Sequence, residues 1–164
     1  MKIVGETNEY FDERNEAMNV QTPTAFGPAL IGQTEKALDA ILVRELAGTG
    51  LSASGWVILK LAEGAGGRLG RQDLVDLGRT QAKFAADKST AAIESALSLG
   101  LLEADEGEVV LTPAARELQT RVVGTTDEIR ARLWGDLPEA DLAAAGRVLS
   151  TVLSRANAEL GYSI

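Results

Sequence analysis

The hydrophobic positions along the chain predict a mainly helical protein. From Leu30 onward, apolar residues recur at spacings of three, four and seven, which places them on one stripe of a helix that ends near Gly48 or Gly50. The stripe consists of Leu30, Ile31, Leu38, Ile41, Leu42 and Leu46. Ser52 is a suitable N-cap for a second helix, whose segment 56–62 is apolar almost all round and is therefore expected in the core.

Two shorter helices are predicted in the middle of the chain. One covers 71–77, and Asp87 is expected to cap another that ends at Gly100. The segment 64–70 between them and the preceding helix is rich in glycine. It lacks both GxGxxG and a Gly-Lys-Ser/Thr ending, and it follows a helix, so we predict an interhelical turn here and no phosphate-binding loop.

The second half of the chain begins with the only extended pattern. Residues 101–111 form two short apolar segments around an acidic turn that contains Gly107, which favours a β-hairpin. Thr112 and Pro113 then mark the start of a long helix, because a hydroxyl caps the helix and proline suits its first position. Pro138 starts a last helix with a nearly heptad rhythm, which is typical of a helix that packs against a partner. Its apolar residues are Leu142, Ala145, Leu149, Val152, Ala156 and Leu160.

The composition narrows the possible chemistry. A chain of 164 residues with 45% hydrophobic and 24% charged residues fits one globular domain. It contains no Cys and no His, which excludes disulfides, thiolate nucleophiles, Cys/His zinc sites and Ser-His-Asp triads. We therefore predict no metal, no cofactor and no enzymatic activity. Because no apolar N-terminal run or membrane-spanning stretch is present, we expect a cytoplasmic protein without a membrane partner.

The charge is unevenly distributed although the formal net charge is −8. Residues 60–88 carry six basic residues against four acidic ones, whereas residues 89–112 carry five acids and no base. The positive charge thus gathers on the middle helices, where it is suited to phosphate contacts. The alternative is that these are ordinary solvated charges, which are common on an acidic domain.

Four segments, in this order of elements, resemble MarR-family transcriptional regulators. They are Leu51–Leu59, Leu99–Glu103, Leu111–Arg116 and Leu137–Leu142. The resemblance covers about residues 26–160, and the Leu-Thr-Pro-Ala-x-Arg step is its most specific part. It implies a mainly α protein with a winged helix-turn-helix core at 51–112 and a small β-hairpin wing. Dimerisation helices at 26–50 and 113–164 would flank the core, after a polar arm at 1–25.

The resemblance also implies a function. Such a protein would be a homodimeric DNA-binding regulator that binds operator DNA, usually as a repressor that responds to a small-molecule effector. The residues expected to bind DNA are Arg68, Arg71, Arg79, Lys83, Lys88, Ser89 and Thr90. Those expected at the dimer interface are Leu38, Leu42, Leu142, Leu149, Val152 and Leu153. Trp56 either fills the core or borders the effector pocket.

The sequence departs from the family pattern at the wing and before the recognition helix. The wing lacks the family's Asp-x-Arg-x-x-Arg pattern and offers only acids, so we expect phosphate to repel it. These acids are Glu103, Asp105, Glu106 and Glu108. The stretch between Gly78 and Asp87 is longer than usual, which leaves the start of the recognition helix open. The alternative function is therefore a winged-helix protein-interaction module that has lost operator binding.

Overall fold

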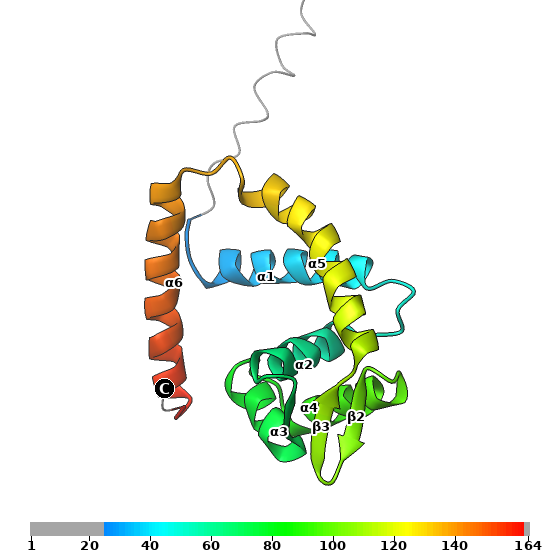
Figure 1. Ribbon diagram of the computed structural model, residues 1–164. Helices are drawn as coiled ribbons and strands as arrows, with labels where there is room; N and C mark the ends of the chain where they lie inside the picture. The colour runs from blue at the N-terminus through cyan, green and yellow to red at the C-terminus, as the bar shows by residue number, and fades with distance from the viewer. Residues whose placement is uncertain (1–24, 163–164) are drawn as a thin grey trace, which may run out of the picture. The chain divides into compact units, whose positions relative to one another are not determined.

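The computed structural model describes residues 25–162, so the predicted polar arm lies almost entirely outside the described residues. The chain divides between Leu38 and Asp39 into two units, and the first helix crosses this boundary. Figure 1 labels the elements along the chain. They are α1 (Pro28–Glu45), α2 (Ala53–Gly64), β1 (Arg68–Gly70), α3 (Arg71–Thr80), α4 (Ala86–Ser98), β2 (Leu102–Asp105), β3 (Glu108–Leu111), α5 (Pro113–Trp134) and α6 (Glu139–Glu159).

Hydroxyl caps start two of these helices as the sequence predicts. Ser52 Oγ accepts a hydrogen bond from the Gly55 N–H at 3.0 Å at the start of α2. Thr112 Oγ1 accepts from the Ala115 N–H at 3.2 Å at the start of α5, and it also donates to the Gly100 carbonyl at 2.9 Å. Thr112 therefore ties the N-terminus of α5 to the end of α4, which fixes where α5 leaves the core.

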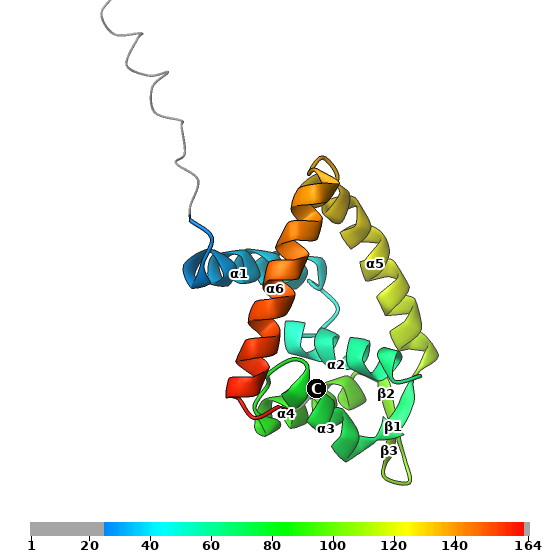
Figure 2. The same ribbon diagram turned by 90° about the vertical axis from the view of Figure 1, so that its left-hand side faces the viewer.

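The three strands form one antiparallel sheet in the order β1-β3-β2. The predicted hairpin is confirmed, with Leu102 opposite Leu111 and Asp105 opposite Glu108. Strand β1 corrects the prediction that segment 64–70 is only a turn, because Leu69 pairs with Val109 on β3. A strand of three residues has no periodicity of its own and exists through its pairing with β3. Figures 1 and 2 both show the β2–β3 hairpin projecting beyond the helices.

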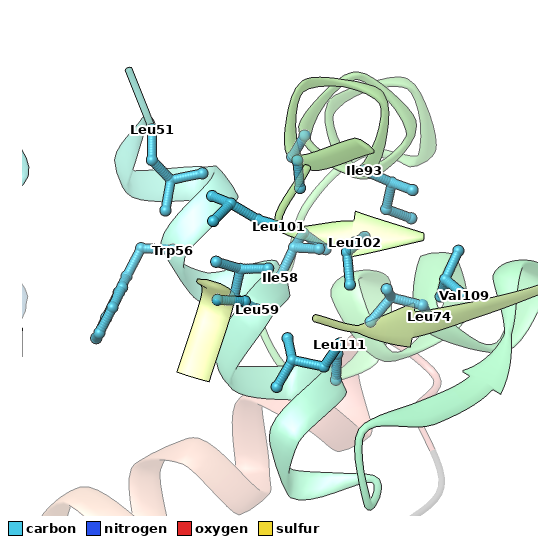
Figure 3. Packing of buried hydrophobic residues seen from close by; sticks show 14 of the residues in the cluster. Leu51, Trp56, Ile58, Leu59, Leu74, Ile93, Leu101, Leu102, Val109 and Leu111 are labelled. Atoms are coloured by element: carbon cyan, nitrogen blue, oxygen red, sulfur yellow. The ribbon is translucent and has the colours of Figure 1, made fainter. Parts of the chain in front are cut away.

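The hydrophobic core joins α2, α3 and α4 to the sheet (Figure 3). Its fully buried large side chains are Ile58, Leu59, Leu74, Ile93, Leu102 and Val109. Trp56 is also buried in this cluster, in agreement with its interpretation as a core residue. Gln119 Nε2 on α5 donates to the Leu59 carbonyl at 3.2 Å, which attaches α5 to α2.

The predicted cap of α4 is wrong. The helix begins at Ala86 with Ala85 as its N-cap, and Asp87 lies in its first turn, where its carboxylate accepts from the neighbouring Lys88 N–H at 2.8 Å. The turn from α3 into α4 is closed by the Phe84 N–H, which donates to the Gly78 carbonyl at 3.0 Å. Lys83 in this turn has φ +58°, and this left-handed residue reverses the chain so that α4 can start.

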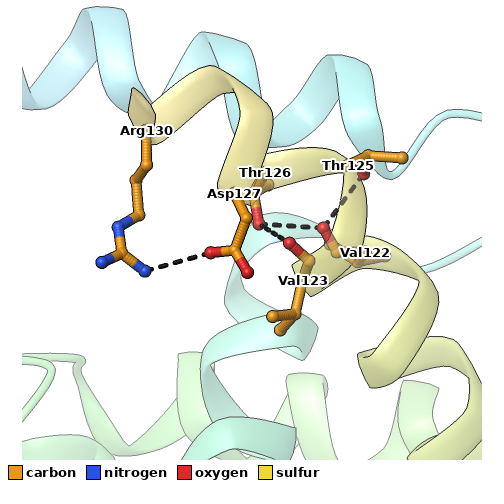
Figure 4. Close-up of polar contacts among 6 residues, drawn as sticks. All are labelled: Val122, Val123, Thr125, Thr126, Asp127 and Arg130. Atoms are coloured by element: carbon orange, nitrogen blue, oxygen red, sulfur yellow. Dashed lines mark hydrogen bonds and ion pairs between the residues drawn. The ribbon is translucent and has the colours of Figure 1, made fainter. Parts of the chain in front are cut away.

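Beyond the core, α5 and α6 have mostly exposed side chains. In the middle of α5 the polar side chains find their partners within the helix, as Figure 4 shows. Thr125 and Thr126 donate to the Val122 carbonyl at 3.0 and 2.9 Å, and Arg130 pairs with Asp127 at 3.1 Å. Among the residues that the structure describes, no helix is long and apolar enough to cross a membrane.

Candidate nucleic-acid interface

The helix pair α3 and α4 forms the candidate interface, and a glycine sets how closely the two helices approach. A Cβ atom built on Gly78 would lie 2.3 Å from Ser89 Oγ and 3.2 Å from Ser89 Cβ. A side chain at position 78 requires the Ser89 hydroxyl to turn away and the two helices to separate slightly, because both distances are shorter than van der Waals contact. This contact, together with Leu74 and Ile93 in the core, fixes α4 against α3.

The inward face of α4 consists of Ser89, Ala92, Ile93 and Ala96. Ser89 is fully buried, so its prediction as a DNA-binding residue is wrong: the hydroxyl points toward α3 and cannot reach a ligand outside. Lys88 and Thr90 are exposed on the opposite side. The Thr90 hydroxyl donates to the Ala86 carbonyl at 2.9 Å, so its remaining capacity is as an acceptor.

Three of the predicted DNA-binding arginines form ion pairs with carboxylates. Arg71, at the start of α3, pairs with Glu94 on the exposed face of α4. Arg79 lies 3.5 Å from Asp76, one turn earlier on α3. Arg68 pairs with two carboxylates of the wing. A phosphate group would have to compete with these partners, although exposed pairs of this kind are individually weak.

Two lysines differ from the arginines in their surroundings. Within residues 25–162, neither Lys83 nor Lys88 forms an ion pair with a carboxylate. Each ammonium group instead lies over an aromatic ring: Lys88 Nζ is 4.3 Å from the centre of the Phe84 ring, and Lys83 Nζ is 4.4 Å from that of Tyr162. Together with Arg79, these lysines surround the turn that leads into α4. We call Arg79, Lys83 and Lys88 the turn cations.

The wing holds a basic residue that the hairpin sequence alone does not reveal. Arg68 on β1 reaches across the sheet to Asp105 on β2, at 2.9 Å, and to Glu108 on β3, at 2.5 Å. Hydrogen bonds to Glu108 and then Asp105 raise the pKa of Arg68 above its ordinary value, so the guanidinium stays charged. The expectation of a wing without a cation is corrected, because the third strand supplies one.

The wing nevertheless keeps an excess of negative charge. Glu103 and Glu106 are exposed and take part in no ion pair among the described residues. Glu106 has φ +48° and sits with Gly107 at the tip of the hairpin. The wing therefore presents carboxylates where it projects farthest.

We expect the double substitution Glu103→Gln and Glu106→Gln to strengthen binding to duplex DNA or to leave it unchanged. The change removes two negative charges that repel phosphate while the pairs of Arg68 with Asp105 and Glu108 stay intact, and at physiological salt this repulsion is screened beyond about 8 Å. Fluorescence anisotropy with a labelled duplex measures the effect. A loss of binding would show that the two glutamates themselves recognise DNA.

All but one of the predicted dimer-interface residues lie on surfaces that a single chain leaves uncovered. On α6, Leu149 is 42% exposed, Val152 44% and Leu153 56%, and Leu142 is exposed as well. Asn157 is the only buried residue of this helix. Leu38 on α1 is exposed, whereas Leu42 is half-buried and packs against the core, so it contributes to the core of its own chain.

Two shallow hollows lie where the α1–α2 connection meets α5, and both are lined by Gly48, Thr49 and Arg121. A third lies at the end of α5 beside Arg130 and Trp134. Trp134, for which packing or a dimer contact is expected, is 39% exposed.

By sequence, the chain matches no family model and no curated protein. Its fold, however, matches solved structures. The ligand-free organohalide-sensing regulator RdhR-CbdbA1625 superposes with a TM-score of 0.67 and 14% identity, and the match covers 77% of each chain. A MarR family transcriptional regulator from Silicibacter pomeroyi DSS matches with a TM-score of 0.65 and 21% identity over 79% of this chain and 88% of the regulator.

A third structure, BpsR from Bordetella bronchiseptica, matches with a TM-score of 0.61 and 21% identity, over 76% of this chain and 96% of BpsR. At these identities the likeness concerns the fold. The order of the helices, the three-stranded wing and the α3–α4 pair agree with it. The fold expected from the sequence is thereby confirmed: the chain has the winged-helix fold of MarR-family transcriptional regulators.

Proposed function

We propose that the protein is a homodimeric DNA-binding transcriptional regulator. The observation that carries the proposal is the position of the turn cations, Arg79, Lys83 and Lys88, around the N-terminus of α4 in a winged helix-turn-helix. Ala85 offers no side-chain cap to α4, and although the Asp87 carboxylate takes the Lys88 N–H, the helix dipole favours an anion at this end. Duplex DNA supplies such anions in a regular array.

In this proposal the helix-turn-helix provides most of the contacts to phosphate. Lys88 and Thr90 lie on the exposed face of α4, and Arg71 and Arg79 flank it from α3. Helix α4 contains no Arg, so it cannot recognise a guanine through an arginine that donates two hydrogen bonds to the base edge. Sequence preference then has to come from hydroxyl and lysine contacts and from the shape of the DNA.

Dimerisation follows from the exposed apolar side of α6. A helix with Leu149, Val152 and Leu153 uncovered needs a partner, and a second copy supplies an identical surface that packs around a two-fold axis. Such a dimer would present two copies of α4 to two half-sites on one face of the DNA.

The proposal includes regulation by a small-molecule effector. Two of the similar structures concern ligands: RdhR-CbdbA1625 is known with 2,4-dichlorophenol bound, and DNA binding by BpsR is regulated by 6-hydroxynicotinic acid. Trp56 on α2 is the residue of this chain that we propose beside such an effector.

The alternative, a protein-interaction module without DNA binding, is favoured by the acidic wing with its exposed Glu103 and Glu106. The two functions differ in their response to salt. DNA binding through phosphate contacts weakens steeply as salt rises, because counterions are released from the DNA on binding. A protein-interaction module that does not bind DNA shows no salt-dependent binding to a duplex.

We expect Lys88→Ala to weaken binding to every duplex and to lower its salt dependence. Each lost phosphate contact reduces the slope of log K against log salt by about 0.9, so a dimer loses about 1.8. The measurement is a titration of labelled duplex at low and physiological salt, with DNA from upstream of the gene and a scrambled duplex. Lys60→Ala is the matched control, since Lys60 lies on α2 and pairs with Glu63.

If Lys88→Ala and Lys60→Ala weakened DNA binding equally, the helix-turn-helix would not be the surface that contacts DNA. Absence of salt-dependent binding to either duplex by the wild-type protein would favour the protein-interaction module.

A further inference from the structure

The chain forms a defined turn at the C-terminal end of α6, and this turn positions the aromatic residue Tyr162. Gly161 has φ +72°, the Tyr162 N–H donates to the Asn157 carbonyl at 2.9 Å, and the Gly161 N–H donates to the Ala158 carbonyl at 3.1 Å. These two bonds and the left-handed glycine define a Schellman motif, which fixes the direction of the residue that follows the glycine. In such motifs that residue packs against the last turn of the helix, which agrees with the burial of Asn157.

The ring of Tyr162 lies against the turn between α3 and α4. Lys83 Nζ is 4.4 Å from the ring centre and Arg79 Cζ is 6.0 Å from it, both within the range of cation–π attraction. Lys83 Nζ also donates to the Thr80 carbonyl. Tyr162 thus contacts two of the three turn cations, Arg79 and Lys83, whereas Lys88 lies over Phe84.

We propose that Tyr162 is an intramolecular competitor for DNA phosphates at Lys83 and Arg79. The inference rests on the proposed function, because it concerns the same cations. A phosphate that binds Lys83 competes with the aromatic ring for the ammonium group, since the Thr80 carbonyl already takes one of its three donors and the ring covers one of its sides. A phosphate contact at Lys83 or Arg79 therefore competes with the contact to Tyr162, and the C-terminal turn of α6 lowers the affinity of the helix-turn-helix for DNA.

This arrangement couples α6 to the DNA-binding helices. Any event that moves the end of α6 away from α3 removes the ring of Tyr162 from Lys83 and Arg79 and strengthens phosphate binding. Any event that holds α6 in place keeps them engaged. Tyr162 is in this sense a positioning residue that acts through the two cations.

The first measurement tests the contact without DNA. Protons of the Lys83 side chain that lie over the Tyr162 ring are shifted upfield in the NMR spectrum, and we expect Tyr162→Leu to remove the shift and Tyr162→Phe to keep it. Absence of the shift in the wild-type protein would overturn the inference, whatever the protein binds.

The second measurement uses DNA. Cation–π contacts at exposed sites correspond to about a two- to fivefold change in affinity for each subunit, so we expect Tyr162→Leu to bind duplex more tightly by this factor and with a steeper salt dependence. Tyr162→Phe should resemble the wild type. In a Lys83→Ala background, the gain from Tyr162→Leu should shrink, because the principal cation is absent.

The outcomes separate the two ideas. If the wild-type protein binds DNA and Tyr162→Leu leaves the affinity unchanged or lowers it, the inference is wrong and the proposed function stands. If neither protein binds any duplex, both fail. Binding by Tyr162→Leu together with weak or absent binding by the wild type would be the strongest support.

Discussion

A chain that carries Leu149→Asp and Val152→Asp is expected to sediment as a monomer or to lose its folded state. Both side chains lie on the exposed apolar side of α6, the surface proposed to meet a second copy. Two subunits would bring four carboxylates into one apolar interface, and each buried charge without a partner costs several kcal/mol. A penalty of that size exceeds what an interface of helices can absorb.

The control for this prediction adds the same charge to the other side of the helix. Ser150 and Ser154 lie on α6 between and beyond the two substituted positions, on the side away from them, and both are exposed. Ser150→Asp with Ser154→Asp should therefore remain dimeric. Sedimentation velocity at micromolar concentration, with circular dichroism to follow folding, distinguishes the outcomes. A wild-type protein that is a folded monomer under these conditions would contradict the proposed dimer.

The elements of the fold could be predicted from local signals because most of their boundaries are set by local chemistry. Ser52 and Thr112 cap helices through their own hydroxyls, and the spacing of apolar residues in α2 and α5 needs no knowledge of the rest of the chain. Strand β1 was missed for the opposite reason. Its three residues become a strand only because β3 lies beside them.

The candidate site was less predictable than the fold because the chemistry of a cation depends on its neighbours in space. Arg68 and the wing carboxylates are far apart in the sequence, so the charges within the hairpin segment alone do not reveal that Arg68 belongs to the wing. Tyr162 likewise lies far along the chain from Lys83. Whether Ser89 faces outward or inward depends on where α4 begins, and the sequence leaves that start open, whereas the structure places it at Ala86.

Gly78 is another residue whose role no local pattern reveals, since a glycine inside a helix has no required contact of its own. It has helical backbone geometry and is not among the residues with positive φ, so its role is to provide space. The neighbour that fills the space is Ser89, whose hydroxyl is buried and has no hydrogen-bond partner among the described residues. The helix-turn-helix therefore depends on a close approach of α3 and α4 at this point.

We expect Gly78→Ala to destabilise the protein by about 1–3 kcal/mol, the usual cost of forcing an extra carbon into a packed core. Gly124→Ala is the matched control, because a Cβ at Gly124 on α5 meets nothing within 4 Å and should stabilise its helix by about 0.5–1 kcal/mol. Adding Ser89→Ala to Gly78→Ala removes the Oγ contact at 2.3 Å and leaves the Cβ contact at 3.2 Å, so stability should return in part. Thermal and urea unfolding measure all four proteins. Equal effects of Gly78→Ala and Gly124→Ala, or no recovery in the double variant, would show that the α3–α4 crossing is not set by this contact.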